Sequence, residues 1–591
     1  MPNEPQTSQV VYTNKAHCRD CYRCLRVCPV KAIRMENGQA YVVPERCISC
    51  GTCIRECPQG AKQFRNDIDR AVRLIASGAT VAASIAPSFV AIFSEPERKR
   101  LASALRKLGF AYVGETAIGA YHVAAETAKI VNSQPDRSHL CTACPAVVSY
   151  VERYEPDKVD LLVPVVSPML AHAKHIKDKL GRGTKVVFIG PCIAKKAEAS
   201  RSENAGMVDC VLTFTELVEW LEREGINLQM CEESHFDEVP EGDARFFPVV
   251  GGSMRTASLH TDLLAAGAVS VSGFNEVKEA LMGSGSDGAP TIVEPLFCSQ
   301  GCVNGPAAPG KGSLYERRRE VLDYASANKG IDPEPESAPA DLKTRFRPTE
   351  AQDTSDISEE MIREVLEKTG KSAPENQLNC GACGYASCRD KAIAVIQGMA
   401  ELEMCIPYMR RLAEQRTDRI IETSPNGIVI LDDRLNIISM NPAFRNFFMC
   451  SEAVCGRPIS YLMDPHPFEQ LAAGKTDRLE AVVRHERYNL MCHQIMYALR
   501  EEKQYVGILV NITKSRAHKE KLDHLRSQTV AQARELLDHQ VHIAQTIAKF
   551  VGESTAQGEA LLDKLIVLAG DESGESDREG LDWLKDTYTS K

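Results

Sequence analysis

Residues 18–29 read CRDCYRCLRVCP and residues 47–58 read CISCGTCIRECP, and these two stretches decide the fold of the N-terminal region. Each has four cysteines separated by two, two and three residues, and each ends in proline. Three cysteines at three-residue intervals let one tight loop bind three corners of an iron–sulfur cube. A disulfide framework or a pair of zinc sites is the alternative, but zinc sites rarely repeat a four-cysteine run followed by proline. The repeat therefore predicts two clusters that carry electrons.

The repeated pattern resembles that of the bacterial two-cluster ferredoxins and predicts a domain with two 4Fe-4S clusters over residues 1–70. In such a domain the fourth cysteine of each run is held by the proline turn and reaches across to the other cube. Cluster one is then expected to bind Cys18, Cys21, Cys24 and Cys57, and cluster two to bind Cys47, Cys50, Cys53 and Cys28.

The composition is that of an ordinary globular protein, since 43% of the 591 residues are hydrophobic and 25% are charged. The formal net charge of −10 argues against nucleic acid as the main partner, because phosphate binding needs a basic face. The first residues lack a basic-then-apolar signal, and no uncharged apolar run is long enough for a membrane span. We therefore expect a cytoplasmic protein with no membrane contact. Thiols stay reduced there, so the 22 cysteines indicate metal binding.

The rest of the chain is predicted to be multidomain, of mixed α/β and α+β class. In residues 71–328, strands predicted at 80–85, 185–189 and 246–250 alternate with helices at 97–108 and 215–224. Residues 329–357 are rich in Pro, Asp, Glu and Ser, which is typical of a linker. The remaining predicted units are a small cysteine-bearing domain at 358–411, a domain at 412–513, and a helix with a solvated tail at 514–591.

Three short cysteine motifs lie between residues 71 and 328, and they read CTACP at 141–145, GPCIAKKAE at 190–198 and EPLFCSQGC at 294–302. Cys192 follows a predicted strand, so it lies in a strand-to-helix loop, where ligands bind in α/β folds. Cys298 and Cys302 are four residues apart in a segment that contains glycine and can chelate one metal centre. Thiolates that converge from distant loops suit a buried cluster. The alternative for each cysteine alone is a small buried hydrophobe.

Taken together, the three motifs resemble the signature motifs of the iron-iron hydrogenases, and the resemblance covers about residues 1–325. It implies an H-cluster domain at 71–328, of the type that forms the C-terminal domain of the iron hydrogenase large subunit. By this resemblance Cys144, Cys192, Cys298 and Cys302 hold a 4Fe-4S cube, and Cys302 also bridges to a di-iron unit with CO and CN ligands. The assembly is the H-cluster, and its substrate is H2.

Further segments match those that line the di-iron pocket in that family, namely Ala86-Pro87-Ser88, Ser167-Pro168-Met169 and Gly251-Gly252-Ser253-Met254. Lys195 corresponds to a lysine that contacts a cyanide, and an ammonium beside an anionic cyanide offsets buried negative charge. Alone, Lys195 would be interpreted as a solvated loop residue, but Cys192 three residues earlier favours the pocket. The resemblance thus assigns catalytic-site roles to Lys195, Ser88, Ala86, Pro87, Ser167 and Met169.

The chain also departs from the family where protons are handled. Active members carry a second cysteine just before the Cys144 position, and its thiol relays a proton, whereas here the residue is Ala143. A methyl group cannot carry a proton. Thr127 and Ile130 stand where we expect carboxylates, and Gly190 and Leu296 replace two usual methionines, while Cys141 lies in another register. The sequence therefore predicts slow hydrogenase activity on a retained cluster scaffold.

A third cysteine module lies in the 358–411 unit. Cys380, Cys383 and Cys388 are on a glycine-containing loop, a helix is predicted at 391–404, and Cys405 follows it. The four can enclose one cube, and the pattern resembles the small 4Fe-4S domain of electron-transfer and corrinoid-reducing proteins. Closed four-thiolate sites also bind structural zinc, which is the alternative. With the H-cluster cube, four cubes are expected in all.

Residues 412–513 resemble a PAS domain. Strands are predicted at 428–430 and 437–441 with a turn at 432–433 between them, followed by an apolar helix through Phe448 and a last strand at 507–513. Cys450, Cys455 and Cys492 lack paired spacing, so unliganded thiols are the better interpretation. His485 lies between Arg484 and Glu486 and is expected to be solvated.

After the PAS-like region, apolar residues recur at three-to-four spacing or its sums, at Leu522, Leu525, Leu536, Ile543, Ile547 and Phe550. That pattern predicts a signalling helix or a coiled coil in a homodimer, and a helix folded onto the PAS-like domain is the alternative. No kinase, phosphatase or nucleotide-binding motif follows, so the output is expected from a separate kinase or phosphatase.

The favoured hypothesis is a sensory iron-iron hydrogenase that detects H2 or redox state at an H-cluster and relays it to the PAS domain. One alternative is a catalytic hydrogenase that exchanges electrons with a partner such as ferredoxin, which Ala143 argues against. The other is a non-enzymatic iron–sulfur scaffold or electron-transfer protein without the di-iron unit. Lys195 and the pocket segments argue weakly against that alternative.

Overall fold

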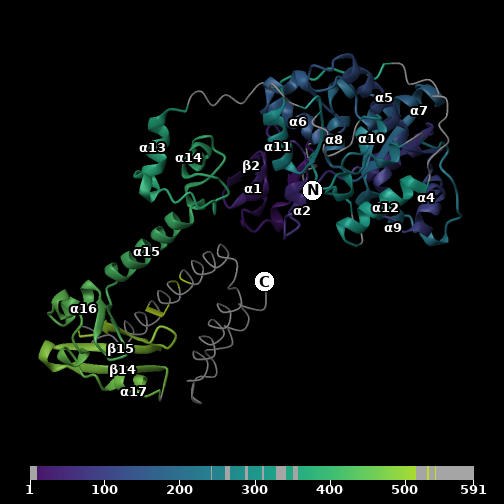
Figure 1. The fold of residues 1–591 in the computed structure, drawn as a ribbon. Coiled ribbons are helices and arrows are strands. Elements are labelled where there is room, and N and C mark those ends of the chain that lie inside the picture. Colours follow the sequence, from purple (N-terminus) through teal and green to yellow (C-terminus); the bar gives the residue numbers. More distant parts are fainter. Residues whose placement is uncertain are drawn as a thin grey trace. The chain divides into compact units, whose positions relative to one another are not determined.

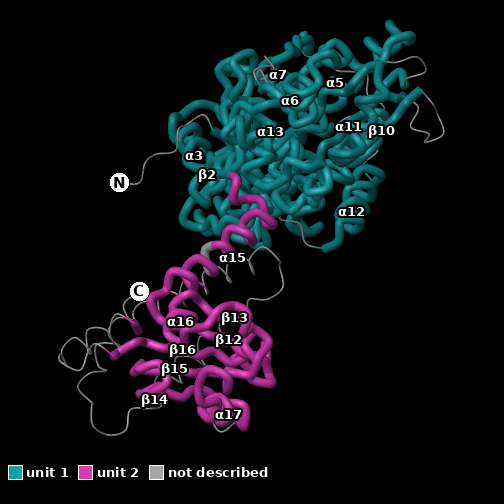
Figure 2. Tube along the Cα trace, turned by 90° about the vertical axis from the view of Figure 1, so that its left-hand side faces the viewer, with its two compact units in different colours: residues 1–401 teal, residues 402–591 magenta. Residues whose placement is uncertain are grey.

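A computed structural model describes residues 9–240, 243–259, 267–285, 290–308, 312–327, 341–349, 357–474 and 476–513, with a few isolated positions up to 540. The chain divides into two compact units, residues 1–401 and residues 402–591, coloured teal and magenta in Figure 2. Each unit is described by itself. The helix predicted over 514–591 lies outside the described residues, apart from those isolated positions.

The first unit begins with a small domain made of two short hairpin-like pairs (Figure 1). Strand β1 (Val11–Thr13) pairs antiparallel with β4 (Lys62–Phe64), and β2 (Ile33–Glu36) pairs antiparallel with β3 (Gln39–Val42). Two short helices, α1 (Arg23–Val27) and α2 (Thr52–Arg55), lie within the two cysteine runs. The domain thus has the internal repeat that the sequence predicts.

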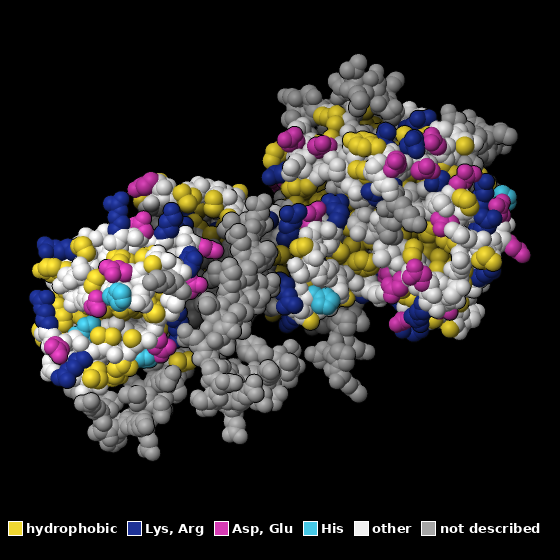
Figure 3. All heavy atoms as spheres, turned by 90° about the horizontal axis from the view of Figure 1, so that it is seen from below, with side chains coloured by type: hydrophobic (Ala, Val, Ile, Leu, Met, Phe, Trp, Pro, Cys, Tyr) yellow, Lys and Arg dark blue, Asp and Glu magenta, His cyan; other side chains and the backbone are white. Residues whose placement is uncertain are grey.

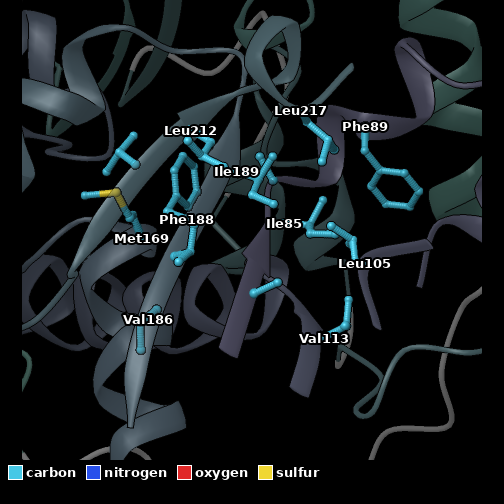
Figure 4. Close-up of a cluster of buried hydrophobic side chains, with 14 of the residues drawn as sticks. Ile85, Phe89, Leu105, Val113, Met169, Val186, Phe188, Ile189, Leu212 and Leu217 are labelled. Carbon is cyan, nitrogen blue, oxygen red and sulfur yellow. The ribbon is translucent and has the colours of Figure 1, made fainter. Parts of the chain in front are cut away.

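An α/β region follows, built on a four-stranded parallel sheet in the order β6-β5-β8-β9. Its strands are β5 (Val81–Ile85), β6 (Tyr112–Glu115), β8 (Lys185–Gly190) and β9 (Cys210–Thr213). Strand β5 is buried along its whole length, as expected for a parallel strand covered on both faces. Figure 4 shows Ile85, Phe188 and Ile189 of this sheet together with Met169 and Leu217 from the flanking helices.

Helices cover this sheet, and two of them, α4 (Glu95–Lys107) and α9 (Phe214–Arg223), lie where the sequence predicts helices at 97–108 and 215–224. The others include α5 (Ala117–Ser133) and α7 (Pro168–Leu180). Helices α4 and α9 begin with capping boxes, Ser94 with Glu97 and Thr213 with Glu216. A second parallel sheet has the order β10-β11-β7, with β7 (His139–Leu140), β10 (Ala268–Ser272) and β11 (Ile292–Leu296).

The strand predicted at 246–250 is wrong. The segment forms a short 3-10 turn, Ala244–Phe246, followed by further turns up to Gly251. Pro248 lacks an N–H for a strand ladder, and a Cβ on Gly252 would lie 1.9 Å from the Phe246 carbonyl oxygen. The Pro248 carbonyl instead accepts from the Cys302 backbone N–H at 2.8 Å. The apolar run therefore supports a cysteine loop and not a sheet.

Part of the predicted linker packs on the α/β region. The described residues 341–349 lie along it, with the Thr344 N–H donating to the Pro164 carbonyl and an antiparallel bridge between Val165 and Lys343. Phe346 packs against a buried cluster that includes Leu140 and Val147. We call residues 341–349 the strap.

The small cysteine-bearing domain contains α13 (Glu359–Lys368) and α14 (Cys388–Ile396), which share a core formed by Ile362, Leu366 and Ala392. The single helix predicted at 391–404 is wrong in its second half. Helix α14 ends at Ile396, Gly398 has a positive φ of 68°, and a separate 3-10 turn covers Leu402–Met404. A left-handed glycine ends a helix because it satisfies the last carbonyls at no steric cost.

The second unit is a five-stranded antiparallel sheet in the order β13-β12-β16-β15-β14, preceded by the long helix α15 (Ile406–Thr423). The strands are β12 (Gly427–Leu431), β13 (Ile437–Met440), β14 (Arg478–His485), β15 (Leu490–Leu499) and β16 (Gln504–Asn511). Helices α16 (Pro442–Phe447) and α17 (His466–Ala472) complete a core around Phe444, Phe448 and Phe468.

The solvated position predicted for His485 is wrong. Its side chain is buried, its Nε2 lies 2.6 Å from Gln494 Nε2, and its ring contacts Phe448 with centroids 5.1 Å apart. Burial lowers the pKa of His485. Charged neighbours in sequence predicted exposure, but His485 closes the β14–β15 pair on its core-facing side. Cys492 is buried, Cys450 is half-buried and Cys455 is exposed.

Among the described residues, no helix is both long and apolar enough to span a bilayer. Figure 3 shows acidic and basic side chains intermixed over the visible face.

Candidate iron–sulfur and hydrogenase-type site

Three loops at the carboxyl ends of strands and the starts of helices carry the predicted cube ligands of the α/β region. Cys144 caps helix α6 (Pro145–Tyr154), and Cys192 lies between β8 and helix α8 (Ala194–Ala199). Cys298 follows β11, and Cys302 begins a 3-10 turn that ends at Asn304. A parallel sheet gathers such loops at one edge, where ligands bind in α/β folds.

These four thiols influence one another electrostatically. Burial raises the pKa of Cys192 to about 11, and the neighbouring Cys144 raises it further, while Lys195 opposes the rise. Burial, then the thiolates of Cys192, Cys144 and Cys302, raise the pKa of Cys298. Four crowded thiols on half-buried residues cannot all ionise without a compensating positive charge. The donor set therefore suits a multi-iron cluster, whose iron ions supply that charge.

In the ferredoxin-like region, electrostatic interactions group the thiols into two sets. Each set has the first three cysteines of one run and the fourth cysteine of the other run. Burial raises the pKa of Cys24 to about 11, and the thiolates that raise it further are Cys21, Cys18 and Cys57. For Cys53, burial and then Cys50, Cys47 and Cys28 raise the pKa. The fourth cysteine of each run thus lies near the other run's three, as a two-cluster arrangement requires.

Across the described part of the chain, no three His, Cys, Asp or Glu side chains meet around a single metal-ion position. A cube does not need such a meeting point, because each thiolate binds a different iron corner.

The loop of cluster two packs directly against the cysteine loops of the α/β region. A Cβ on Gly51, which has a φ of 76°, would lie 2.6 Å from Pro306 and 2.8 Å from Ile193. Cys50 and Ile48 share a buried cluster with Cys144 and Cys192, and Cys50 also raises the pKa of Cys298. The ligands of cluster two and of the predicted H-cluster cube are therefore near neighbours.

Helix α6 links the same two regions by hydrogen bonds. Cys144 caps its first turn, and at its other end Arg153 donates to the carbonyls of Pro44, Glu45 and Cys47. The Tyr154 hydroxyl donates to the Arg46 carbonyl at 2.6 Å. One rigid element thus fixes a predicted cube ligand relative to the cluster-two loop.

Two pocket residues predicted from the resemblance have buried hydroxyl oxygens without a partner. Ser88 Oγ and Ser167 Oγ make no hydrogen bond to any described residue. Buried hydroxyls are normally satisfied, so these two atoms face a ligand or water site. Ala86, Pro87 and Met169 are buried beside them. The cyanide-bearing di-iron unit of the resemblance would offer acceptors at such a place.

Lys195 is mostly buried and is not the solvated loop residue of the alternative interpretation. Its Nζ lies 2.8 Å from Glu198 Oε2 and 3.4 Å from the Ala143 carbonyl oxygen. Sequence reasoning missed Glu198, although its spacing of three residues on a short helix is the signal for such an ion pair. A water-sized cavity lies beside the pair, lined by Ser167, Glu198 and Phe346 of the strap among others.

Sequence reasoning also missed the buried carboxyl of Glu294, which interacts electrostatically with Cys302. Glu294 lies in β11 and accepts from the backbone N–H groups of Gly251 and Ser253 and from the Ser270 hydroxyl. Burial raises the pKa of Glu294 to about 7 despite these three hydrogen bonds. A charged residue inside an otherwise apolar strand is the signal that could have found it.

The third module contacts the ferredoxin-like region near α1. A Cβ on Gly384 would lie 3.1 Å from Leu25, and Arg26 donates to the Ala382 carbonyl at 3.0 Å. Lys31 has its pKa lowered by burial, while Cys28 and Cys383 both act in the opposite direction. Cys383 therefore lies within electrostatic reach of the same lysine as a cluster-two ligand.

The other three predicted ligands of this module differ in exposure and in the compact unit to which they belong. Cys380 is exposed, and Cys388 begins α14 and is half-buried. Cys405 is buried at the start of α15 and belongs to the second unit, so it is described apart from the other three.

Comparison with protein families gives four matches. Residues 79–306 match the C-terminal domain of the iron only hydrogenase large subunit, residues 10–58 a 4Fe-4S dicluster domain, residues 376–407 an Fe-S cluster family, and residues 415–482 a PAS domain.

Among curated proteins, the periplasmic Fe hydrogenase large subunit of Nitratidesulfovibrio vulgaris is 27% identical over 400 residues, which is 55% of this chain and 95% of that protein. The cytosolic Fe-S cluster assembly factor NAR1 of Vanderwaltozyma polyspora is 36% identical over 104 residues, which is 17% of this chain and 20% of that protein. A variant of the FeFe-hydrogenase HydA1 of Chlamydomonas reinhardtii matches 48% of this chain and 99% of its own, with 19% identity and a TM-score of 0.40.

These features define an iron–sulfur protein with a hydrogenase-type domain. Residues 79–306 match the C-terminal domain family of the iron only hydrogenase large subunit, and the chain joins this region to a 4Fe-4S dicluster domain and a PAS domain.

Proposed function

We propose that this protein is a sensory iron-iron hydrogenase, which detects H2 or redox state at an H-cluster and passes the signal through iron–sulfur clusters to the PAS domain. A separate kinase or phosphatase would give the output, ferredoxin or a similar carrier would exchange electrons, and the chain would act as a homodimer. The proposal includes four cubes and one di-iron unit with CO and CN ligands.

The observation that carries the proposal is the combination of a complete thiol set with a missing proton donor. Cys144, Cys192, Cys298 and Cys302 are clustered and half-buried, yet the position before Cys144 is Ala143. An enzyme selected for turnover gains about 10²–10⁴-fold from a positioned acid. A sensor needs only to bind and respond, so loss of this donor suits sensing.

The residues present fit the H-cluster. The four cysteines would hold the cube, and the unpartnered Ser88 and Ser167 hydroxyls and the Lys195 ammonium would face the di-iron unit. When bound, that group supplies the cleavage of H2 into protons and electrons. The residues of the chain would hold the H-cluster in a buried pocket. The contact of Gly51 with Pro306 and Ile193 would keep cluster two near the H-cluster for electron transfer.

A non-enzymatic iron–sulfur scaffold is the second candidate, because the short match to NAR1, a cluster assembly factor by name, is the higher of the two identities. Infrared spectroscopy separates the two functions. Protein matured with the di-iron unit should show CO and CN bands that shift under H2. Iron-replete protein without such bands after maturation would favour the scaffold.

Deletion of residues 514–591 tests the sensory part. Every proposed ligand lies before Ile406, so the truncated protein should keep its clusters and its H2 chemistry. It should lose H2-dependent control of the output partner. Retained control, or loss of clusters, would contradict the division between sensing and output.

A further inference from the structure

A buried histidine group in the α/β region has no part in the function proposed so far. His122 lies on α5, and His172 and His175 lie on α7. All three are at most 9% exposed, and the ring centroids of His122 and His172 lie 5.6 Å and 6.1 Å from that of His175. Helices α5 and α7 meet closely here, since a Cβ on Gly119 would lie 2.7 Å from His172 Cβ.

One end of this group lies beside the predicted di-iron pocket. His172 Nδ1 is 2.8 Å from Ser84 Oγ, and Ser84 Oγ is 2.8 Å from Thr116 Oγ1. Ser84 is two residues before Ala86 on the strand that leads into the pocket. His172 is five residues after Ser167, whose buried hydroxyl has no partner in the described chain.

The other end reaches the surface. His175 Nε2 lies 2.8 Å from Glu238 Oε1, and Glu238 Oε2 accepts from the Tyr112 hydroxyl and from Lys179 Nζ, both at 2.8 Å. The Lys179 side chain is 42% exposed. Hydrogen bonds from His175, Lys179 and Tyr112 outweigh the effect of burial, and they lower the pKa of Glu238. A charged acceptor therefore stands between the histidines and solvent.

Between the two ends of the histidine group, one imidazole nitrogen is not satisfied by the described residues. His172 Nε2 is buried and has no hydrogen-bond partner among the described residues. A Cβ on Gly114 would lie 3.1 Å from His172 Cε1 and 2.8 Å from the Tyr112 hydroxyl, so the imidazole and the phenol flank the same glycine. A histidine kept only for core stability would have both nitrogens satisfied. The free nitrogen points to a group that exchanges a proton.

We propose that Ser84, His172, His175 and Glu238 form a proton pathway between the hydrogenase-type pocket and the surface at Lys179. The inference rests on the proposed function, because it needs a pocket that releases protons. Cleavage of one H2 yields two protons and two electrons. The electrons leave through the iron–sulfur clusters, and each proton crosses the pathway alone. An imidazole takes a proton on one ring nitrogen and releases one from the other. No hydrogen bond joins the described rings of His172 and His175, whose centroids lie 6.1 Å apart, so a water molecule at the open His172 Nε2 carries the proton between them, and no oxidant or reductant is needed.

The pathway would be slow, in keeping with a sensor. Burial, followed by the charge of His175, lowers the pKa of His122 to about 4 and that of His172 to about 3. At neutral pH only about one His172 in 10⁴ carries the extra proton. The histidines also stand close to where the family's acid relay is interrupted, because Thr127 and Ile130 lie on the same helix as His122.

The test compares two adjacent acidic residues. Glu238→Gln removes the charged acceptor of the pathway, whereas Asp237→Asn changes a neighbour that binds Arg106 and the Val113 N–H outside it.

The first readout needs no di-iron unit. In full-length protein labelled with 15N-histidine, the exchange of the His172 ring proton with water is measured by NMR. We expect exchange despite full burial, slowed about tenfold or more by Glu238→Gln and unchanged by Asp237→Asn. Exchange that is unaffected by Glu238→Gln would overturn the pathway.

The second readout is H2 oxidation by matured protein with an artificial electron acceptor. Glu238→Gln and His175→Gln should each lower the rate about tenfold, while reduction of the clusters by dithionite stays at the wild-type rate. If either variant fails to fold, the other carries the test, since His175 and Glu238 share one hydrogen bond. Equal rates for both variants and wild type would contradict the pathway. Matured wild-type protein with no H2 chemistry would refute the proposed function, and the ring-proton exchange would still decide the pathway.

Discussion

The hydrogenase-type pocket has two sides: an iron side, which carries the predicted cluster cysteines, and a proton side next to Ala143, where the family carries a proton donor. The two sides differ in how many residues of the family pattern they retain. On the iron side, four thiols from distant loops converge, and Gly51 in the loop of cluster two packs against Pro306 and Ile193 of the same region. On the other side, Ala143 packs in a cluster with Ala117, Ala120 and Ala124 of α5, and the methyl groups of these alanines cannot relay a proton. Cluster binding and proton delivery therefore depend on separate residues, and one can be kept while the other is lost.

Loss of a cube ligand should have the largest effect. Four cubes and one di-iron unit amount to about 18 iron atoms per chain. Cys298→Ala should lower iron content by up to about six atoms and abolish H2 chemistry, because a buried cluster with an open corner is not retained. Iron and sulfide analysis measures this. Cys141→Ala is the control, since Cys141 is also buried but is not a predicted ligand. Equal iron loss in both variants would mean a general folding defect.

Restoring a donor on the proton side should have the next largest effect. Ala143→Cys places a thiol beside the carbonyl that Lys195 contacts, and we expect H2 turnover to rise by about 10–100-fold. The gain is partial because Thr127 and Ile130 still interrupt the acid relay. Iron content and infrared bands should not change. Wild-type turnover already as fast as that of Ala143→Cys would remove the basis for a sensory role.

The contact between cluster two and the cysteine loops can be weakened without removing a ligand. Gly51→Ala adds a methyl group 2.6 Å from Pro306 at a φ of 76°, so the loops must move apart. We expect electron transfer to slow several-fold, as measured by stopped-flow reduction of the H-cluster, with iron content kept. Gly60→Ala is the control, because its positive φ is similar and nothing lies within 4 Å of the added carbon. Equal slowing in both variants would exclude the contact as the cause.

Local patterns are the basis of the predicted cluster ligands, which stay predictions, and such patterns failed where distant contacts decide the structure. The two CxxCxxCxxxCP runs are enough to predict both ligand sets, because spacing alone determines which thiols share a loop. The segment 246–250 is apolar like a strand, but Pro248 and the close approach at Gly252 turn it into a support for Cys302. His485 looks solvated among charged neighbours, yet β15 places Gln494 opposite its ring.

Two of the features that sequence reasoning missed come from residues far apart in sequence. The strap lies in a Pro- and Glu-rich stretch with the composition of a linker, and its packing is visible only in its contacts with distant residues, such as the bridge to Val165. The histidine group joins α5, α7 and Glu238, and no periodicity links Glu238 to His175, which are 63 residues apart. Sequence could have pointed to His122, His172 and His175 only as polar residues on otherwise buried helix faces.

The smallest expected effect is on stability, and it concerns the same histidines. An unfolded histidine titrates near pH 6.5, whereas the folded pKa of His122 is about 4. Between these values the unfolded chain binds a proton that the folded chain does not, so the contribution of His122 is full above pH 6.5 and is lost as pH falls toward 4. We expect the free energy of unfolding to drop by roughly 3 kcal/mol from this residue over that range. Anaerobic urea titrations, followed by the fluorescence of buried Trp220, should show a shallower pH dependence in His122→Gln. The exposed His235 serves as the control, and a His235→Gln curve that flattens as much as that of His122→Gln would show that burial of the histidine group does not set the slope.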